Sequence, residues 1–225
     1  GQIAVPDATV ADYRDFQRRL GLSRSVFVAS SNYGDDDRVV LDALGQVGTE
    51  RMRGVVILHG DVDPERLPTL HDRGVRGIRI YFAKGKVPDS AGFDRLTRLA
   101  AERGWSVNVV GNRNREVLLD WESAMANAPC PVMVDHIGWT PQPTGPDSAT
   151  GKMLRRLLAT GNVYVKLSGP YLSSRSGAPE FDDVDMLART LAADVPERVV
   201  WGSDWPHPVA AQQHIPVDGA RLFDQ

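Results

Sequence analysis

The chain has 225 residues, of which 42% are hydrophobic and 24% charged, as is usual for a soluble globular protein. Its formal net charge of −3 argues against a basic nucleic-acid-binding surface, and it has no apolar run near the length of a membrane helix. A single cysteine, Cys130, excludes an internal disulfide. No secretory leader is evident, so we expect a cytoplasmic protein without a nucleic-acid or membrane partner, and leave self-association open.

Short apolar segments recur along the chain and predict buried strands. Most contain three or four consecutive apolar residues rather than an alternating pattern, which is typical of strands in a parallel sheet that is covered on both faces. The predicted strands are 25–30, 55–59, 77–82, 106–110, 132–136, 163–168 and 199–204.

Segments with apolar residues at three- and four-residue spacing lie next to these strands and predict helices. They are 9–20, 36–44, 64–71, 93–102, 115–126, 153–159 and 183–193. Glycines just past four of them, Gly21, Gly74, Gly104 and Gly161, suit the left-handed conformation that ends many helices.

The mean spacing of about 29 residues between strand starts is that of one strand–helix unit. We therefore predict an α/β fold, a single (β/α)8 TIM barrel over residues 1–225. An open doubly wound sheet is the alternative, but the glycine-rich first turn typical of that fold is absent. Seven strands are predicted where eight are needed, so we expect the first strand and the last helix to be lacking, which leaves the barrel incomplete at both ends.

Functional residues of such barrels lie at the carboxyl ends of the strands. His136 follows an apolar strand, where an imidazole could bind a metal, donate to a carbonyl oxygen or simply be buried. Asp204 precedes Trp205 and is either a desolvated general base or a structural cap. Arg79 projects from an apolar strand, paired with a structural acid or placed to clamp an anionic substrate.

Other polar residues stand at the same strand ends. We expect Ser31, Asn32, Tyr81, Asn108 and His207 to contact the substrate. Lys166 either faces the substrate or pairs with Asp135, and the sequence leaves both alternatives open. Lys84 and Lys86 add positive charge near Arg79.

Five segments together resemble the amidohydrolase-2 branch of the amidohydrolase superfamily, and in particular the 2-pyrone-4,6-dicarboxylate lactonases. The resemblance extends in order from about Thr9 to Asp218. The segments that carry it are Ser31–Gly34, Arg76–Arg79, Val134–Gly138, Lys166–Tyr171 and Trp201–Pro208.

The resemblance implies a hydrolase that opens the lactone ring of a carboxylated substrate derived from an aromatic or sugar acid. In that family Asp204 would activate the attacking water, His136 would polarise the carbonyl, Arg79 would hold a substrate carboxylate and Ser31 would donate a hydrogen bond to the substrate. No cofactor is expected. The alternative is a zinc- or manganese-dependent hydrolase or decarboxylase of the same branch, with His136 and Asp204 as metal ligands; a further alternative is a binding subunit without activity.

The sequence departs from the family pattern in two respects. The His-x-His pair of the family's first strand would precede Gly1, and Gly85 and Leu172 occupy positions where the dicarboxylate lactonases have arginines. A lactone with one carboxylate or a sugar-acid lactone therefore fits better than a dicarboxylate, unless Lys84, Lys86 or Arg175 supplies the charge.

Overall fold

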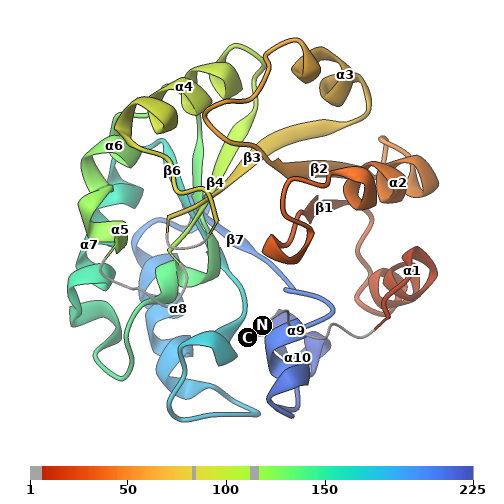
Figure 1. The fold of residues 1–225 in the computed structure, drawn as a ribbon. Coiled ribbons are helices and arrows are strands. Elements are labelled where there is room, and N and C mark those ends of the chain that lie inside the picture. The colour runs from red at the N-terminus through yellow and green to blue at the C-terminus, as the bar shows by residue number, and fades with distance from the viewer. Residues whose placement is uncertain (1–6, 83–84, 112–116, 225) are drawn as a thin grey trace.

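The computed structural model describes residues 7–82, 85–111 and 117–224, and these form one curved parallel sheet with helices on its outer face (Figure 1). The strands pair in sequence order, each parallel to the next. They are β1 (Ser25–Val28), β2 (Met52–Ile57), β3 (Val75–Tyr81), β4 (Ser106–Val110), β5 (Val132–Val134), β6 (Val163–Leu167) and β7 (Val199–Trp201). The α/β class and the seven-stranded barrel-like arrangement are thus confirmed, and the described residues contain no eighth strand.

The helices alternate with the strands as predicted. Those that follow β1 to β6 cover the outer face of the sheet, whereas α1, α9 and α10 lie near its open side (Figure 1). Their bounds are α1 (Val10–Arg19), α2 (Arg38–Val47), α3 (Arg66–Asp72), α4 (Ser90–Ala101), α5 (Val117–Asp120), α6 (Glu122–Ala126), α7 (Ala149–Ala159), α8 (Asp182–Asp194), α9 (Pro208–Gln212) and α10 (Gly219–Asp224). Among the described residues no helix has the length and apolar character needed to cross a bilayer.

Helix caps explain why α4 and α7 begin earlier than the apolar spacing predicts. The Asp89 carboxylate accepts from the Gly92 backbone N–H at 2.7 Å, so α4 begins at Ser90 rather than at Phe93. The Ser148 hydroxyl caps α7 in the same way. The helix predicted over 115–126 is wrong as one element, because it is divided at Trp121 into α5 and α6, and its first two residues lie outside the described ranges.

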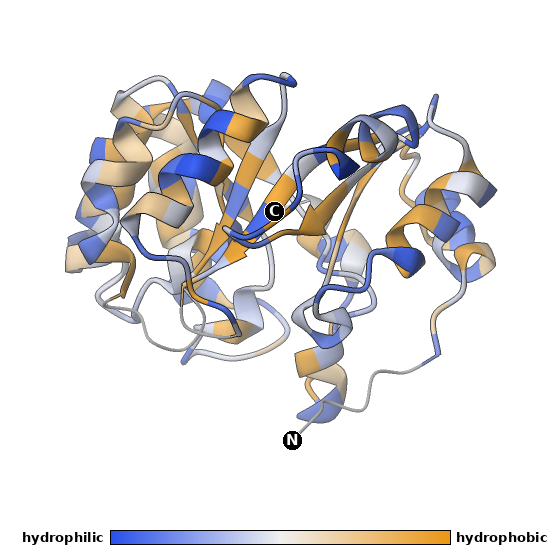
Figure 2. Ribbon diagram, turned by 45° about the horizontal axis from the view of Figure 1, so that its top comes forward, coloured by the Kyte–Doolittle hydropathy of each residue, from blue (hydrophilic) through white to orange (hydrophobic). Residues whose placement is uncertain are grey.

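Apolar strands and the inner faces of the helices form the main core (Figure 2). The predicted burial on both faces is confirmed for the central strands, where Val56, Ile78, Val109 and Val134 are inaccessible or nearly so. Burying such side chains contributes roughly 1.5–3 kcal/mol each. The core therefore fixes the strand order that brings the carboxyl ends together.

The sheet is not closed between β1 and β7. Neither strand has a second strand partner among the described residues, and the edge residues Val26 and Val200 are 59% and 40% exposed. Helix α1 reaches across at the carboxyl end of β7, where the Tyr13 ring lies 5.2 Å from the Trp205 ring. The open side exposes unpaired backbone groups of the kind that promote association with other chains.

Most predicted strand ends differ from the observed ones by one to three residues. The chain leaves the strand conformation before the polar residue at its end. His136 lies two residues beyond β5, and Asp204 lies three residues beyond β7, both with φ in the left-handed region. The predictions that His136 and Asp204 end strands are therefore wrong in detail, because tight turns rather than strands present these side chains.

Candidate active site

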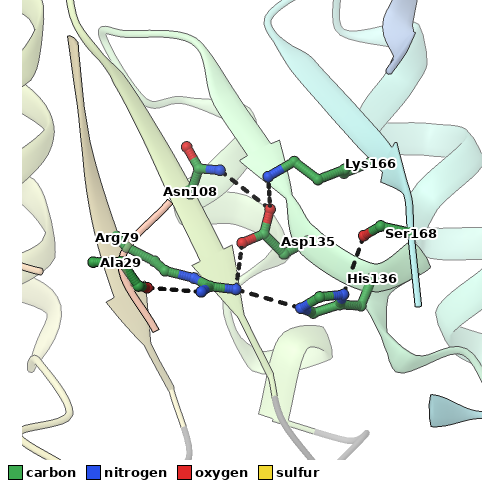
Figure 3. Close-up of polar contacts among 7 residues, drawn as sticks. All are labelled: Ala29, Arg79, Asn108, Asp135, His136, Lys166 and Ser168. Atoms are coloured by element: carbon green, nitrogen blue, oxygen red, sulfur yellow. Dashed lines mark hydrogen bonds and ion pairs between the residues drawn. The ribbon is translucent and has the colours of Figure 1, made fainter. Parts of the chain in front are cut away.

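Asp135 is the centre of a buried polar cluster at the carboxyl ends of β3 to β6 (Figure 3). Its Oδ1 accepts a hydrogen bond from Lys166 Nζ at 2.7 Å and from Asn108 Nδ2 at 3.1 Å. Its Oδ2 lies 2.9 Å from Arg79 Nη2 in an ion pair. Of the two alternatives for Lys166, pairing with Asp135 is thus confirmed.

Charge, rather than solvent, keeps the Asp135 carboxylate ionised. Burial alone would raise its pKa, but the neighbouring Lys166 and Arg79 cations hold that pKa well below its usual range. One carboxylate therefore faces two cations. The cluster keeps an excess positive charge, which favours the binding of an anion.

Arg79 forms an ion pair with Asp135, and its guanidinium has further partners. Nη1 donates to the Ala29 carbonyl oxygen at 2.8 Å, and the guanidinium lies over the Tyr81 ring at 5.0 Å. Its buried Nε has no hydrogen-bond partner among the described residues. Of the two sequence alternatives, pairing with an acid is confirmed.

His136 is held in a left-handed turn after β5. Residues 136–139 all have φ between 51° and 62°, a conformation that residues other than glycine seldom adopt. The imidazole Nδ1 lies 3.1 Å from Ser168 Oγ, and Nε2 lies 3.3 Å from Arg79 Nη2. Burial lowers the pKa of His136, so the ring is neutral at neutral pH. Because arginine only donates, Nε2 accepts and the proton resides on Nδ1.

Asp204 is positioned by a turn and by a tyrosine. Its backbone carbonyl accepts from the His207 N–H at 2.7 Å, and its Oδ2 accepts from the Tyr171 hydroxyl at 2.5 Å. Tyr171 is 6% exposed. Burial and the adjacent carboxylate raise the pKa of Tyr171, so its hydroxyl stays protonated and donating.

A cavity of about 1500 Å³ opens between β1 and β7 and contains most of these groups. Of the residues selected from the sequence, it is lined by Arg79, Asn108, His136 and Asp204. Asp135, Lys166 and Ser168, for which the sequence predicted no definite catalytic role, line the same cavity.

A second cavity of about 260 Å³ lies at the carboxyl ends of β2 and β3. Ser31, Tyr81 and Lys86 line it, and Arg79 borders both cavities. Asn32 and His207 line neither. The His207 ring instead packs edge-on against Tyr171, and Lys84 is outside the described residues.

The described side chains are a poor fit to a metal ion. They contain no group of three or more His, Cys, Asp and Glu residues placed to hold one. The His136 Nε2 lone pair, which would face such an ion, is directed at the Arg79 cation.

The sequence pattern of the amidohydrolase family matches residues 2–224. The chain belongs to the amidohydrolase family. Among curated relatives, the 4-sulfomuconolactone hydrolase of Rhizobium radiobacter is 33% identical over 90% of this chain and 67% of its own length. The 2-pyrone-4,6-dicarboxylate hydrolase of Comamonas testosteroni is 32% identical over 95% of this chain and 72% of its own length.

The fold of this amidohydrolase agrees with that of a solved relative. An apo crystal structure from Agrobacterium tumefaciens superimposes with a TM-score of 0.83 at 29% identity, and covers 98% of this chain and 77% of its own. The resemblance inferred from the five segments is thereby confirmed at the level of family and fold. The chain spans about two thirds to three quarters of the length of these relatives.

Proposed function

We propose that this amidohydrolase opens the ring of an anionic lactone by attack of water on the ester carbonyl. The observation that carries the proposal is the shared cavity in which the Asp204 carboxylate accompanies a buried cluster with excess positive charge. A base on one side and cations on the other are what ester hydrolysis needs. The named activities of the two curated relatives, both lactone hydrolases, support the same reaction class.

Asp204 takes the proton from the attacking water. The water oxygen bonds to the carbonyl carbon, negative charge develops on the carbonyl oxygen, and the ring C–O bond then breaks. The departing ring oxygen takes that proton from Asp204, which restores the carboxylate, so that one water is consumed for each lactone opened. Lys166 Nζ, which has N–H groups beyond the one given to Asp135, stabilises the developing oxyanion together with His136.

His136 polarises the carbonyl after a rearrangement. In the free protein Nε2 accepts from Arg79 across 3.3 Å, the longest of the contacts that hold the guanidinium. A substrate carbonyl oxygen displaces this weak contact, and the neutral ring exchanges its Nδ1 proton for one on Nε2. The Ser168 hydroxyl then donates to Nδ1, and Nε2–H donates to the carbonyl oxygen. Arg79 then turns the released N–H, with its unpartnered Nε, toward the substrate carboxylate.

The substrate is an anionic lactone with a single carboxylate, derived from an aromatic or sugar acid. The excess charge near Arg79 and Lys166 is that of one cation, since Asp135 compensates the other. In the smaller cavity, Lys86 already lies 3.7 Å from Asp35, and that carboxylate also binds His59 at 2.5 Å. Lys86 is thus already paired and offers no strong site for a second carboxylate.

The decisive experiment measures turnover of a panel of anionic lactones by the protein and its Asp204→Asn variant. Loss of a general base costs roughly 10²–10⁴-fold in kcat. The variant should retain the wild-type circular dichroism spectrum and bind a lactone analogue. Turnover within about threefold of the wild type, below any expected base effect, would exclude Asp204 as the base.

A further inference from the structure

The Tyr171 hydroxyl makes a hydrogen bond that the reaction scheme above leaves without a function. It donates to Asp204 Oδ2 at 2.5 Å, at the short end of hydrogen bonds between a hydroxyl and a carboxylate. Within the described part of the chain no side chain or backbone group donates to the other carboxylate oxygen, Oδ1. The two oxygens of the base therefore differ: one is engaged by a phenol and the other is available to a ligand.

We propose that Tyr171 is a positioning residue, which holds the Asp204 carboxylate so that Oδ1 is the oxygen that receives the proton of water. This inference rests on the proposed function, since it assigns a means of control to the same base. A carboxylate on a surface turn rotates freely about its side-chain bonds. A single strong donor to Oδ2 removes that freedom before the substrate arrives.

The surroundings of Tyr171 fix its ring independently of Asp204. Its aromatic partners are Phe181 at 6.4 Å and His207 at 6.1 Å, both edge-on. Together with Phe181 and Ala210 it forms a small hydrophobic cluster separate from the main core, to which Ile215 and Leu222 also pack. The C-terminal segment with α9 and α10 thus anchors the phenol.

Local geometry in the connection between β6 and the 3-10 helix η4 (Pro170–Leu172) places the phenol beside Asp204. Gly169 has φ +60°, and a Cβ there would lie 2.8 Å from Leu172 and 3.2 Å from His136 Nδ1. Only glycine lets the chain turn this close to His136 and enter η4 (Pro170–Leu172), which carries Tyr171. The same turn therefore places Tyr171 and limits the space around the imidazole.

A double-mutant cycle tests the inference by its effect on turnover. Tyr171→Phe removes only the hydroxyl oxygen and should lower kcat by about ten- to a hundredfold, the range expected for a hydrogen bond to a charged group, while KM changes little. In the Asp204→Asn background the same substitution should change the residual kcat by less than about threefold, because the two residues act together. Tyr164→Phe is the matched control, because its hydroxyl accepts a hydrogen bond from Arg198 Nη1 at 2.9 Å and does not donate to Asp204.

A measurement that does not depend on turnover accompanies the cycle. In proton NMR the Tyr171 hydroxyl should give a far-downfield, slowly exchanging signal that is lost in Tyr171→Phe and in Asp204→Asn but kept in Tyr164→Phe. A wild-type protein without this signal overturns the inference. So does an unchanged kcat in Tyr171→Phe alongside an inactive Asp204→Asn variant, or an equal loss in both backgrounds. If Asp204→Asn itself retains full turnover, the proposed base fails first, and the positioning role is refuted with it.

Discussion

Replacing Asp135 by Asn should destabilise the protein far more than the loss of an ordinary ion pair. The carboxylate is 1% exposed and contacts Lys166 and Arg79 at 2.7 and 2.9 Å. The substitution leaves two largely buried cations without their anion. Breaking a buried pair in this way costs about 3–5 kcal/mol, against about 5–15 kcal/mol for the whole stability of a domain.

Urea unfolding followed by circular dichroism gives the free-energy difference. The control is Asp37→Asn, which removes the partner of the half-exposed Arg66 at 3.1 Å and should cost less than about 1 kcal/mol. A cost for Asp135→Asn similar to that of the control would refute the assignment of Asp135 as the charge centre of the site.

The pH dependence of stability provides a second check on the same carboxylate. The pKa of Asp135 is lower in the folded than in the unfolded protein, so its ionisation stabilises the fold above the unfolded value, about pH 4. That contribution declines as the pH falls from about 4 toward the folded pKa. The free-energy difference between wild type and Asp135→Asn should therefore be constant near neutral pH and shrink in acid. An unchanged difference at pH 3 would contradict this reasoning.

Three further predictions follow from individual contacts. In competition assays, Arg79→Met should lower the affinity for anionic lactones by about ten- to a hundredfold relative to the affinity for a neutral lactone. Equal losses of affinity for charged and neutral lactones would show that Arg79 is purely structural. Val26→Lys, at the exposed edge of β1, should reduce self-association in light scattering at matched concentration; unchanged scattering would show that this edge is not the surface involved. Gly169→Ala should lower stability by at least about 1 kcal/mol in urea unfolding, because of its positive φ and the 2.8 Å approach to Leu172, and a stabilised variant would contradict the geometry.

The strands and their neighbours were predictable because their signals are local. A run such as Val55–Ile57 is apolar on both faces of the strand. It is therefore stable only where both faces are buried, as in the interior of a parallel sheet. Gly74 and Gly161 follow helix ends and have φ values of 98° and 83°, as their positions after the predicted helices indicated. These features depend on residues within one turn or one strand.

Several residues that line the large cavity were also predictable from the sequence. Carboxyl ends of parallel strands meet at one end of a barrel, so Arg79, His136 and Asp204 had to converge once the strands were recognised. The sequence did not predict which element presents each side chain. His136 and Asp204 stand on left-handed turns that no periodicity marks.

The pairing inside the site was decided only by the tertiary structure. Lys166 meets Asp135 from 31 positions away, and Tyr171 meets Asp204 from 33, across neighbouring strands or the loops beyond them. Tyr81 ends β3 as predicted, whereas Ser31 lies three residues beyond β1, and both line the smaller cavity. Sequence determines which polar groups arrive at the rim of the barrel; strand register and turn geometry determine which of them come within the roughly 3 Å at which a hydrogen bond or ion pair forms.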